Sequence, residues 1–290
     1  MMKSVQLAAM SLFVLLAGCA TQRPAEAIRV GSYNIRYSPG DLGTPNAWDC
    51  RKADMVALVR KLDLDVFGMQ EVCPDQAEDL REQLPEFAFV GDHREADRRS
   101  GEASPVFYRR SRFEAEKGGT FWLSATPEVP GKPGWDAACP RVCTFQVLRD
   151  RVTGKRFCLA NTHTDHVGAE AREKGLRLVL DRMRELGGGM PIVFTGDHNC
   201  FYGEAPARAV REVLKDCRDV VETTAKGPRD TANGFGRYRH EPVRQDHCID
   251  YIYVSDGTRV LDFVTHDDRR PGTDLYPSDH YPITATILLP

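Results

Sequence analysis

Short apolar runs alternate with amphipathic stretches along most of the chain. The amphipathic stretches predict helices over Arg51–Leu62, Asp75–Leu84, Ala169–Leu186 and Ala205–Lys215. The apolar runs, bounded by turn residues, predict strands over Ile28–Tyr33, Asp65–Met69, Phe87–Val90, Ser104–Tyr108, Thr120–Leu123, Val142–Leu148, Arg156–Asn161, Ile192–Thr195, Ile249–Val254 and Pro282–Leu288. This alternation is typical of an α/β protein.

Two long segments carry no such pattern. Residues 129–140 and 225–246 are rich in Gly, Pro and polar side chains, and loops of this length usually carry function. No internal repeat and no shift in composition divides the chain. We therefore expect one domain over residues 28–290.

The first residues carry the pattern of an export signal. A positive charge precedes an apolar run, Val5–Leu16, that is too short for a comfortable membrane-spanning helix. The run leads into Leu-Ala-Gly-Cys, which resembles the bacterial lipobox, whose cysteine is diacylated before cleavage. We expect a lipoprotein signal peptide over residues 1–18, lipidation of Cys19 and a polar tether over residues 19–27. The protein would then lie in the cell envelope, anchored to the outer membrane; an ordinary signal peptide with an incidental Cys19 is the alternative.

Charge and cysteine content narrow the classes of function. The formal net charge of −3 shows no basic excess, which a protein that binds a long nucleic acid would more often carry. A small phosphate ester is compatible with that charge. The chain has nine cysteines, and with Cys19 lipidated an even number remains, which permits disulfides in an exported protein. A zinc site built from cysteines is the alternative, but the chain has no C-x-x-C pair.

Polar side chains of catalytic type follow or flank most of the predicted strands. One such strand end is ordinary surface polarity, but several together indicate that one rim of the sheets forms a site. The residues at these ends are Asn34, Gln70-Glu71, Asn161-Thr162-His163, Gly196-Asp197-His198-Asn199, Asp250 and, ahead of the last strand, Ser278-Asp279-His280.

Three of these side chains offer hard oxygen ligands. Glu71, Asp279 and Asn34 suit a hard divalent cation, so we expect Mg²⁺ or Mn²⁺ as the cofactor. The chain has no G-x-S-x-G nucleophile elbow, which argues against acyl transfer through serine. It also lacks the H-E-x-x-H and G-x-x-x-x-G-K-[ST] motifs.

The other side chains suit proton transfer and phosphate binding. Asp197 is able to hold or deprotonate a water molecule. His163 and His280 are able to donate to phosphate oxygens or to move protons, and Asn199 donates without adding charge. Direct attack of water on a phosphoester, assisted by a metal, uses all of these groups.

The order of the motifs resembles that of a known superfamily. The motifs are SYNIR (Ser32–Arg36), MQEV (Met69–Val72), NTHTDH (Asn161–His166), GDHN (Gly196–Asn199), CIDYIYVS (Cys248–Ser255) and YPSDHYP (Tyr276–Pro282). This ordered set is similar to the endonuclease/exonuclease/phosphatase superfamily and covers nearly all of the expected mature chain, here in a bacterial lipoprotein. The resemblance implies a four-layer α/β sandwich, in which two mixed β-sheets pack together and are flanked by helices.

The resemblance also implies a role for each site residue. Glu71 is then the main metal carboxylate, with Asn34 and Asp279 close to it. Asp197 orients or activates the attacking water.

Phosphate binding and the remaining proton transfer fall to four residues under the same resemblance. Asn199 and His163 hold the scissile phosphate. Asp250 orients His280, and this pair is either the base or the stabiliser of the developing phosphorane. His163 is thus expected to bind substrate and to take part in catalysis.

Three positions depart from the family pattern. His198 stands where an apolar or aromatic residue is usual, Cys248 where Arg is usual, and Thr164 where Leu is usual. These departures bear on the substrate and on the metal geometry. Because Cys200 and Cys248 flank motif strands that converge on the site, and both replace residues usual in the family, we expect them to form a disulfide.

Two other functions fit parts of the pattern. Gly196–Asn199 suggests a calcineurin-like dinuclear metallophosphatase, but that family needs D-x-H after the first strand and a late G-H-x-H, and the chain has neither. A catalytically inactive surface-binding lipoprotein of the same fold is the second; Glu71, Asp197 and His280, whose loss would favour it, are all present. The expected function is therefore metal-dependent hydrolysis of a phosphodiester or phosphomonoester. The substrate is a phospholipid head group, a sugar or inositol phosphate, or nucleic acid, and no protein partner is implied.

Overall fold

The computed structural model describes residues 23–240 and 247–290. The expected signal peptide and Cys19 lie outside the described residues. So do the first part of the predicted tether and the last part of the predicted loop 225–246.

The strands of the described residues form two six-stranded sheets. The first sheet has the order β11 (Arg259–Thr265), β12 (Ile283–Leu288), β1 (Ile28–Asn34), β2 (Val66–Gln70), β4 (Val106–Arg109), β3 (Phe87–Val90). The second has the order β5 (Phe113–Trp122), β6 (Val142–Asp150), β7 (Arg156–His163), β8 (Ile192–Asp197), β10 (Asp250–Val254), β9 (Lys215–Asp216). Both sheets are mixed, because β1 pairs with β2 and β7 with β8 in parallel, while their other strand pairs are antiparallel.

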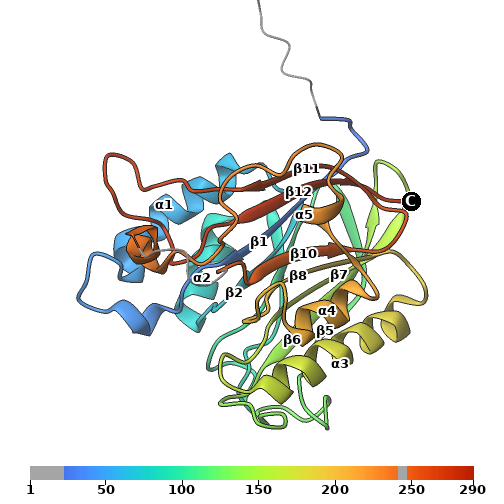
Figure 1. Ribbon diagram of the computed structural model, residues 1–290, viewed down its shortest axis with the longest axis horizontal. Coiled ribbons are helices and arrows are strands. Elements are labelled where there is room, and N and C mark those ends of the chain that lie inside the picture. Colours follow the sequence, from blue (N-terminus) through green and yellow to red (C-terminus); the bar gives the residue numbers. More distant parts are fainter. Residues whose placement is uncertain (1–22, 241–246) are drawn as a thin grey trace, which may run out of the picture.

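Helices cover the outer faces of both sheets. Figure 1 shows α1 (Trp48–Lys61) and α2 (Pro74–Gln83) on one side of the paired sheets and α3 (Ala169–Gly187) and α4 (Ala205–Arg211) on the other. Buried residues of both sheets, such as Val30, Val66, Leu159 and Val193, form one hydrophobic cluster between them. Each sheet also forms one further hydrophobic cluster with the helices that cover it. The four-layer sandwich of two mixed sheets is thus confirmed.

A buried polar network joins the two sheets close to the strand ends that carry the site. Asn161 of β7 accepts a hydrogen bond from Gln70 Nε2 at 2.7 Å and donates to the carbonyl oxygens of Met69 at 2.7 Å and Pro105 at 3.0 Å. Gly68 permits this approach, because a Cβ atom there would lie 2.3 Å from Asn161 and from Thr195 Oγ1. Buried polar groups with all these partners fix the position of one sheet on the other.

Most predicted elements occur within a few residues of their expected ends, but three differ. The strand expected over Thr120–Leu123 is only the end of β5, which begins at Phe113. The helix expected over Ala205–Lys215 ends at Arg211, and Lys215 begins the short strand β9, where it pairs with Val254. The strand β11 was not expected at all. It is an edge strand with mixed exposure, so it lacks the continuous apolar run that marks the inner strands.

The predicted Cys200–Cys248 disulfide is wrong, since all eight cysteines in the described residues are thiols. Both are buried in the cluster between the second sheet and its helices. They do lie near each other, because the Tyr251 hydroxyl is 2.9 Å from the carbonyl oxygens of both. Burial raises the pKa of the Cys200 thiol to about 12, so it behaves as a small hydrophobic side chain.

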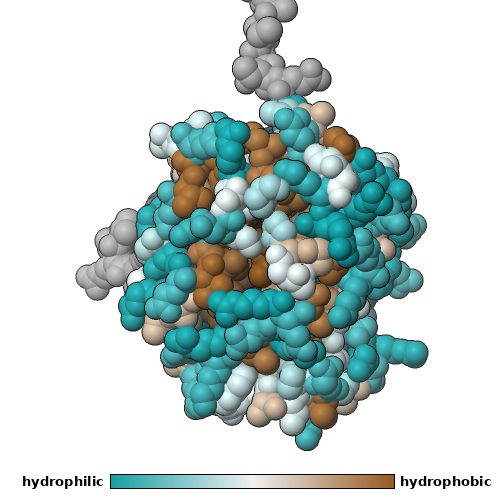
Figure 2. All heavy atoms as spheres, turned by 90° about the vertical axis from the view of Figure 1, so that its right-hand side faces the viewer, coloured by the Kyte–Doolittle hydropathy of each residue, from teal (hydrophilic) through white to brown (hydrophobic). Residues whose placement is uncertain are grey.

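The chain joins the domain already at residue 23. Arg23 Nη1 lies 2.8 Å from Asp65 Oδ2, and Ala27 is fully buried and accepts a hydrogen bond from Arg112. The described end of the predicted tether therefore packs against the domain. No described helix is long and apolar enough to cross a membrane. Figure 2 shows the face that carries the C-terminus: hydrophilic residues cover most of it, and hydrophobic residues show between them.

Candidate active site

Four strand ends meet at one edge of the sandwich. β1 and β2 end at Asn34 and Gln70, and β7 and β8 end at His163 and Asp197. The parallel pairings set Asn34 beside Gln70 and His163 beside Asp197, as the strand-end pattern predicts. A cavity of about 480 Å³ opens here, lined by Arg36, Tyr37, Glu71, Arg94, Glu102, Cys139, Arg141, His163, His166, Asp197, Asn199, Asp279 and His280.

Left-handed backbone turns place three of the lining residues. Arg36, Glu71 and Asn199 have φ values of 60°, 62° and 44°, which residues other than glycine rarely adopt. Each follows a strand end of the sequence motifs, so the chain turns sharply there and presents the side chain to the cavity. Such strain persists where the surrounding structure determines it, and it is common at functional sites.

Asn34 connects two carboxylates. Its Nδ2 donates to Glu71 Oε1 at 3.0 Å and to Asp197 Oδ2 at 2.9 Å, while its Oδ1 accepts from the Arg36 N–H at 2.9 Å. The Arg36 bond fixes which end of the amide faces the carboxylates. Asn34 therefore positions Glu71 and Asp197 relative to each other, and its predicted role as a metal ligand stays a prediction.

Asp197, His280 and Asp250 form a buried acid–base group, with ligand atoms within 4.8 Å of one another. His280 Nδ1 lies 2.8 Å from Asp250 Oδ2, and His280 Nε2 lies 3.8 Å from Asp197 Oδ2. Burial and the nearby Asp250 raise the pKa of Asp197 to about 7. Although burial lowers it, the Asp250 carboxylate holds the pKa of His280 well above its usual value. The surroundings of His280 therefore favour its charged form.

His163 approaches Asp197 from the other side, and its surroundings favour the neutral form. Its Nε2 lies 3.5 Å from Asp197 Oδ2 and 2.9 Å from Asn199 Nδ2. Because Asn199 Nδ2 also donates to the Thr164 carbonyl oxygen, it is the amide nitrogen, and His163 Nε2 accepts from it. Burial and the Arg141 guanidinium hold the pKa of His163 well below its usual value. The structure thus brings the two predicted histidines to either side of Asp197, with their pKa values shifted in opposite directions.

The carboxylates across the cavity fit a divalent cation. Glu71 and Asp279 both line it, and the pKa of Asp279 is raised by burial and by the negative charge of Glu71. Arg36 Nη1 lies 3.6 Å from Asp279 Oδ2, and the positive charges of His280 and Arg51 also act on this carboxyl. Hard oxygen atoms held close together against their own repulsion are the donor set that Mg²⁺ or Mn²⁺ takes.

The sequence analysis did not single out three charged residues of the cavity wall, which are Arg94, Glu102 and Arg141. Glu102 Oε2 lies 3.0 Å from Arg94 Nη1, 3.9 Å from Arg141 Nη1 and 3.8 Å from His163 Nδ1. Burial and the neighbouring Glu71 raise the pKa of Glu102. Arg94 and Glu102 come from a loop rich in charged residues, where sequence pattern does not distinguish a wall residue from a solvated one.

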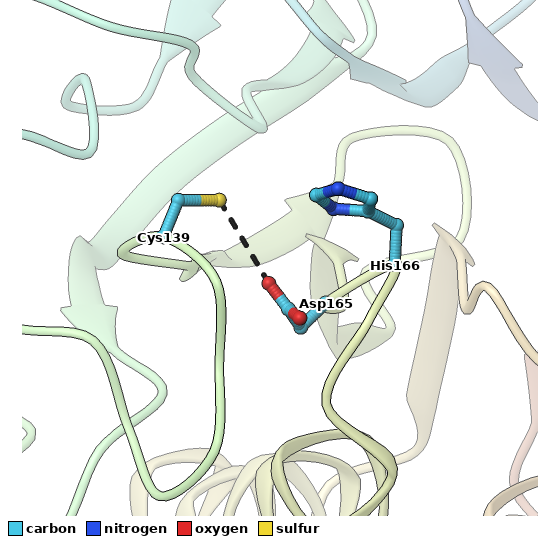
Figure 3. A group of neighbouring side chains, drawn as sticks. All are labelled: Cys139, Asp165 and His166. Atoms are coloured by element: carbon cyan, nitrogen blue, oxygen red, sulfur yellow. Dashed lines mark hydrogen bonds between the residues drawn. The ribbon is translucent and has the colours of Figure 1, made fainter.

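A second group of potential ligands, Cys139, Asp165 and His166, lies beside this wall (Figure 3). Arg141 occupies it: Nε lies 3.4 Å from Asp165 Oδ2 and Nη2 lies 2.9 Å from His166 Nδ1. Asp165 Oδ1 also accepts three backbone N–H bonds, which lower the pKa of this carboxyl to about 2 against the effect of burial. A guanidinium in this place repels a second cation, so the group fixes Arg141 and His166.

His198, the unusual residue of the GDHN motif, packs and does not face the site. It is fully buried, its ring lies against Phe194, Tyr251 and Tyr253, and neither ring nitrogen has a hydrogen-bond partner among the described residues. Burial lowers its pKa to about 3. It thus fills a position where an aromatic residue is usual.

A model of the Endonuclease/Exonuclease/phosphatase family matches residues 31–280. The protein belongs to this family. The family's enzymes hydrolyse phosphoester bonds and generally depend on a divalent metal. The chain is 33% identical to a family member from Bacteroides vulgatus of known structure, with a TM-score of 0.85 over 91% of this chain and 99% of that one. It is 32% identical to a mannosyl-6-phosphatase from Bacteroides thetaiotaomicron, with a TM-score of 0.83 over 90% of this chain and 100% of that one.

Two more distant proteins are also similar to this chain. The catalytic domain of human nocturnin is 19% identical, with a TM-score of 0.69 over 93% of this chain and 97% of that one, and shows the fold alone. A protein of Acanthamoeba polyphaga mimivirus is 22% identical over 255 residues, which are 76% of this chain and 35% of the relative. The chain therefore spans about a third of the length of this curated relative.

Proposed function

We propose that the protein is a metal-dependent phosphoesterase that hydrolyses its substrate by direct attack of water. The observation that carries this proposal is the pair of buried histidines on either side of Asp197, whose Nε2 atoms lie 3.5 Å (His163) and 3.8 Å (His280) from Asp197 Oδ2. Both lie in one cavity with the carboxylates of Glu71 and Asp279. The cavity offers a base, a cationic hydrogen-bond donor and carboxylates for a metal. This combination fits phosphoryl transfer to water better than it fits a protein that only binds a ligand.

The metal would be held by Glu71 and Asp279, with Asn34 beside them. Bound there, Mg²⁺ or Mn²⁺ supplies Lewis-acid stabilisation of charge on the phosphoryl oxygens. Asn34 keeps Glu71 and Asp197 at a fixed separation through its two hydrogen bonds.

The proton transfers fall to two residues. Asp197 accepts a proton from the attacking water, since its carboxylate is buried, fixed in direction and titrates near neutrality. The raised pKa of His280 favours its charged form, which suits it as a donor and not as the base. It donates a hydrogen bond to a phosphoryl oxygen instead, and Asp250 keeps it oriented. As the P–O bond to the alcohol breaks, the leaving alkoxide takes a proton from solvent water, and Asp197 returns its own proton to solvent. Asn199 and His163 lie on the other side and orient the phosphoryl group.

A phosphomonoester of a small hydroxylated alcohol is the substrate we favour. The mannosyl-6-phosphatase relative, 32% identical over 90% of the chain, supports this class. The net charge of −3 gives no support for a long nucleic acid. We also propose that Cys19 anchors the protein to the outer membrane of the cell envelope, on the evidence of the lipobox-like sequence.

A hydrolysis screen tests this function. Protein that starts at Ala20 keeps the Arg23–Asp65 contact and is assayed with Mg²⁺ and Mn²⁺ on sugar phosphates, inositol phosphates, lipid head groups and oligonucleotides. Activity should vanish with EDTA, and Asp197→Asn or His280→Ala should lower kcat by about 10² to 10⁴-fold. Glu71→Ala should regain part of its rate in excess Mg²⁺, which Asp197→Asn should not. An EDTA-resistant rate, or a His280→Ala variant with unchanged kcat, would refute the proposed site.

A further inference from the structure

A second cavity of about 460 Å³ adjoins the first. The two share five lining residues: Arg36, His166, Asn199, Asp279 and His280. Glu71 and Asp197 line the first cavity but not the second. The shared residues therefore form the boundary between the first cavity, which contains the Asp197 carboxylate, and the second cavity, which does not.

The wall of the second cavity offers unused donors and acceptors. Arg172 Nη1 donates a hydrogen bond to the Asp165 carbonyl oxygen at 3.1 Å, and Arg237 Nε donates one to the Gly234 carbonyl oxygen at 3.0 Å. Their remaining guanidinium nitrogens make no hydrogen bond within the described residues. Glu204 uses one oxygen, which accepts from a backbone N–H, and leaves the other available. Donors and acceptors in one wall suit hydroxyl groups, which need both.

Flat rings complete the same wall. Tyr238 stacks on His247, with ring centroids 4.5 Å apart and planes 6° apart, and Phe201 lines the cavity as well. Tyr238 is 37% exposed, so one part of this stack is open to a ligand. The C–H face of a sugar ring packs on such a surface, whereas an acyl chain would require a wall without the two arginines and the glutamate.

We propose that the second cavity binds the alcohol half of the substrate, a hydroxylated ring of monosaccharide size, with Arg172, Glu204, Arg237 and Tyr238 as its specificity residues. This inference rests on the proposed function. Displacement at phosphorus needs the attacking and leaving oxygens roughly in line, so the leaving alcohol lies on the far side of the phosphoryl group from the water. With water at Asp197 in the first cavity and the phosphoryl group at the shared boundary, the alcohol extends into the second. A volume of about 460 Å³ lies in the range of small-molecule sites.

Binding to a slowed enzyme tests the inference without turnover. The Asp197→Asn chain, with Mg²⁺, is titrated by calorimetry with mannose 6-phosphate, glucose 6-phosphate and inorganic phosphate. We expect at least one sugar phosphate to bind about tenfold or more tightly than inorganic phosphate, which corresponds to a few hydrogen bonds. Adding Arg237→Met or Glu204→Gln should remove that advantage and leave phosphate binding unchanged. Arg184→Met, at an exposed position on α3, is the matched control and should change neither.

Kinetics on two leaving groups separates recognition from a general defect. In the otherwise native chain, Arg237→Met and Glu204→Gln should lower kcat/KM for the sugar phosphate about tenfold and leave that for p-nitrophenyl phosphate within about twofold. Equal losses on both substrates would overturn the inference, because they would show a structural role. Sugar phosphates that bind no tighter than inorganic phosphate would overturn it and leave the proposed function standing. Failure to bind even inorganic phosphate would overturn both.

Discussion

Asp197 shows how burial creates chemistry at a single residue. It is only 1% exposed, it faces two histidines, and a further carboxylate, Asp250, lies behind one of them. Its pKa of about 7 is the result of that surrounding, which disfavours the charged form. A carboxylate that gains a proton near neutrality is a better base than one that stays ionised to pH 4.

Burial of the charged Asp197 carboxylate should lower the free energy of unfolding of the metal-free protein. The carboxyl titrates near 3.8 when unfolded and at about 7 when folded, so the folded state binds its proton more tightly. Its contribution to folding stability is present below the unfolded pKa and is lost as the pH rises through the folded one. Asp197→Asn does not titrate. In urea unfolding with EDTA, we expect it to be more stable than the native chain by about 1 kcal/mol or more near pH 8, with the gap closing toward pH 4.5. A gap that stays constant over this range would contradict the prediction.

We also expect His280 and His163 to differ in protonation at neutral pH. Asp250 stabilises the imidazolium of His280, while burial and Arg141 keep His163 neutral. Nitrogen-detected NMR of the metal-free protein at pH 7 should therefore show both ring nitrogens of His280 protonated and only Nδ1 of His163 protonated. Asp250→Asn should return His280 to the neutral form and leave His163 as it is. Two neutral histidines in the native chain would refute the assignment.

The sequence predicted the site residues that follow regular strands, and it did not predict those that lie on irregular loops. A side chain just past a buried strand has a fixed direction, so Asp197 and His163 were predictable as neighbours. Glu102 and Arg94 reach the cavity from a loop whose course depends on tertiary packing, including the bond from Trp122 Nε1 to the Arg94 carbonyl oxygen. No local pattern encodes such a contact.

At the scale of elements, the contact between the two sheets depends on Gly68. A Cβ atom at this position would lie 2.3 Å from Asn161 and from Thr195, and both side chains belong to the buried network. We expect Gly68→Ala to reduce the free energy of unfolding by about 1–3 kcal/mol, because the sheets must separate or the network must break. Urea unfolding measures this.

Gly203→Ala is the matched control for this substitution. A Cβ atom at Gly203 meets nothing within 4 Å, so its effect should stay within about 0.5 kcal/mol. An equally small effect of Gly68→Ala would show that the sheets do not depend on this approach.

The same scale explains which elements the sequence predicted. Strands such as β8 are buried on both faces and appear as continuous apolar runs. β11 alternates irregularly at the sheet edge around a register shift between Val260 and Asp262, so neither period is visible in its sequence. The expected helix at Ala205–Lys215 was too long because Leu214, which is buried, continues the apolar pattern after the helix has ended.

For the whole molecule, the proposed membrane attachment rests on a residue outside the described part. Cys19 follows a short apolar run and two small residues, as in a bacterial lipobox. We expect the native chain to fractionate with membranes and Cys19→Ser to be soluble in the periplasm or to accumulate as unprocessed precursor. Cys50→Ser, at an exposed cysteine far along the chain, is the control and should stay with the membranes. A soluble native product would refute the anchor.

The fold also predicts how an anchored molecule faces the membrane. The chain joins the domain at Arg23 and Ala27, at the start of β1, and the site lies at Asn34, where β1 ends. Seven residues of strand span about 20 Å, so the point where the chain enters the domain and the cavity lie at opposite ends of the strand. If Cys19 is the anchor, four residue steps of about 14 Å at most join it to Arg23, so an anchored domain would stay close to the bilayer with its cavity turned away.

We therefore expect the substrate to come from solution and not from the membrane that holds the anchor. The full chain, reconstituted in vesicles, should hydrolyse a soluble phosphomonoester with the same kcat/KM as the form that starts at Ala20. It should leave a phosphorylated lipid head group in its own vesicle intact. Lengthening the segment before Arg23 by about 20 flexible residues would give the cavity access to the surface, because the reach of the tether would then exceed the span of the domain. Faster hydrolysis of the vesicle's own lipid by the unlengthened chain would contradict this orientation, since the cavity would then have to face the bilayer.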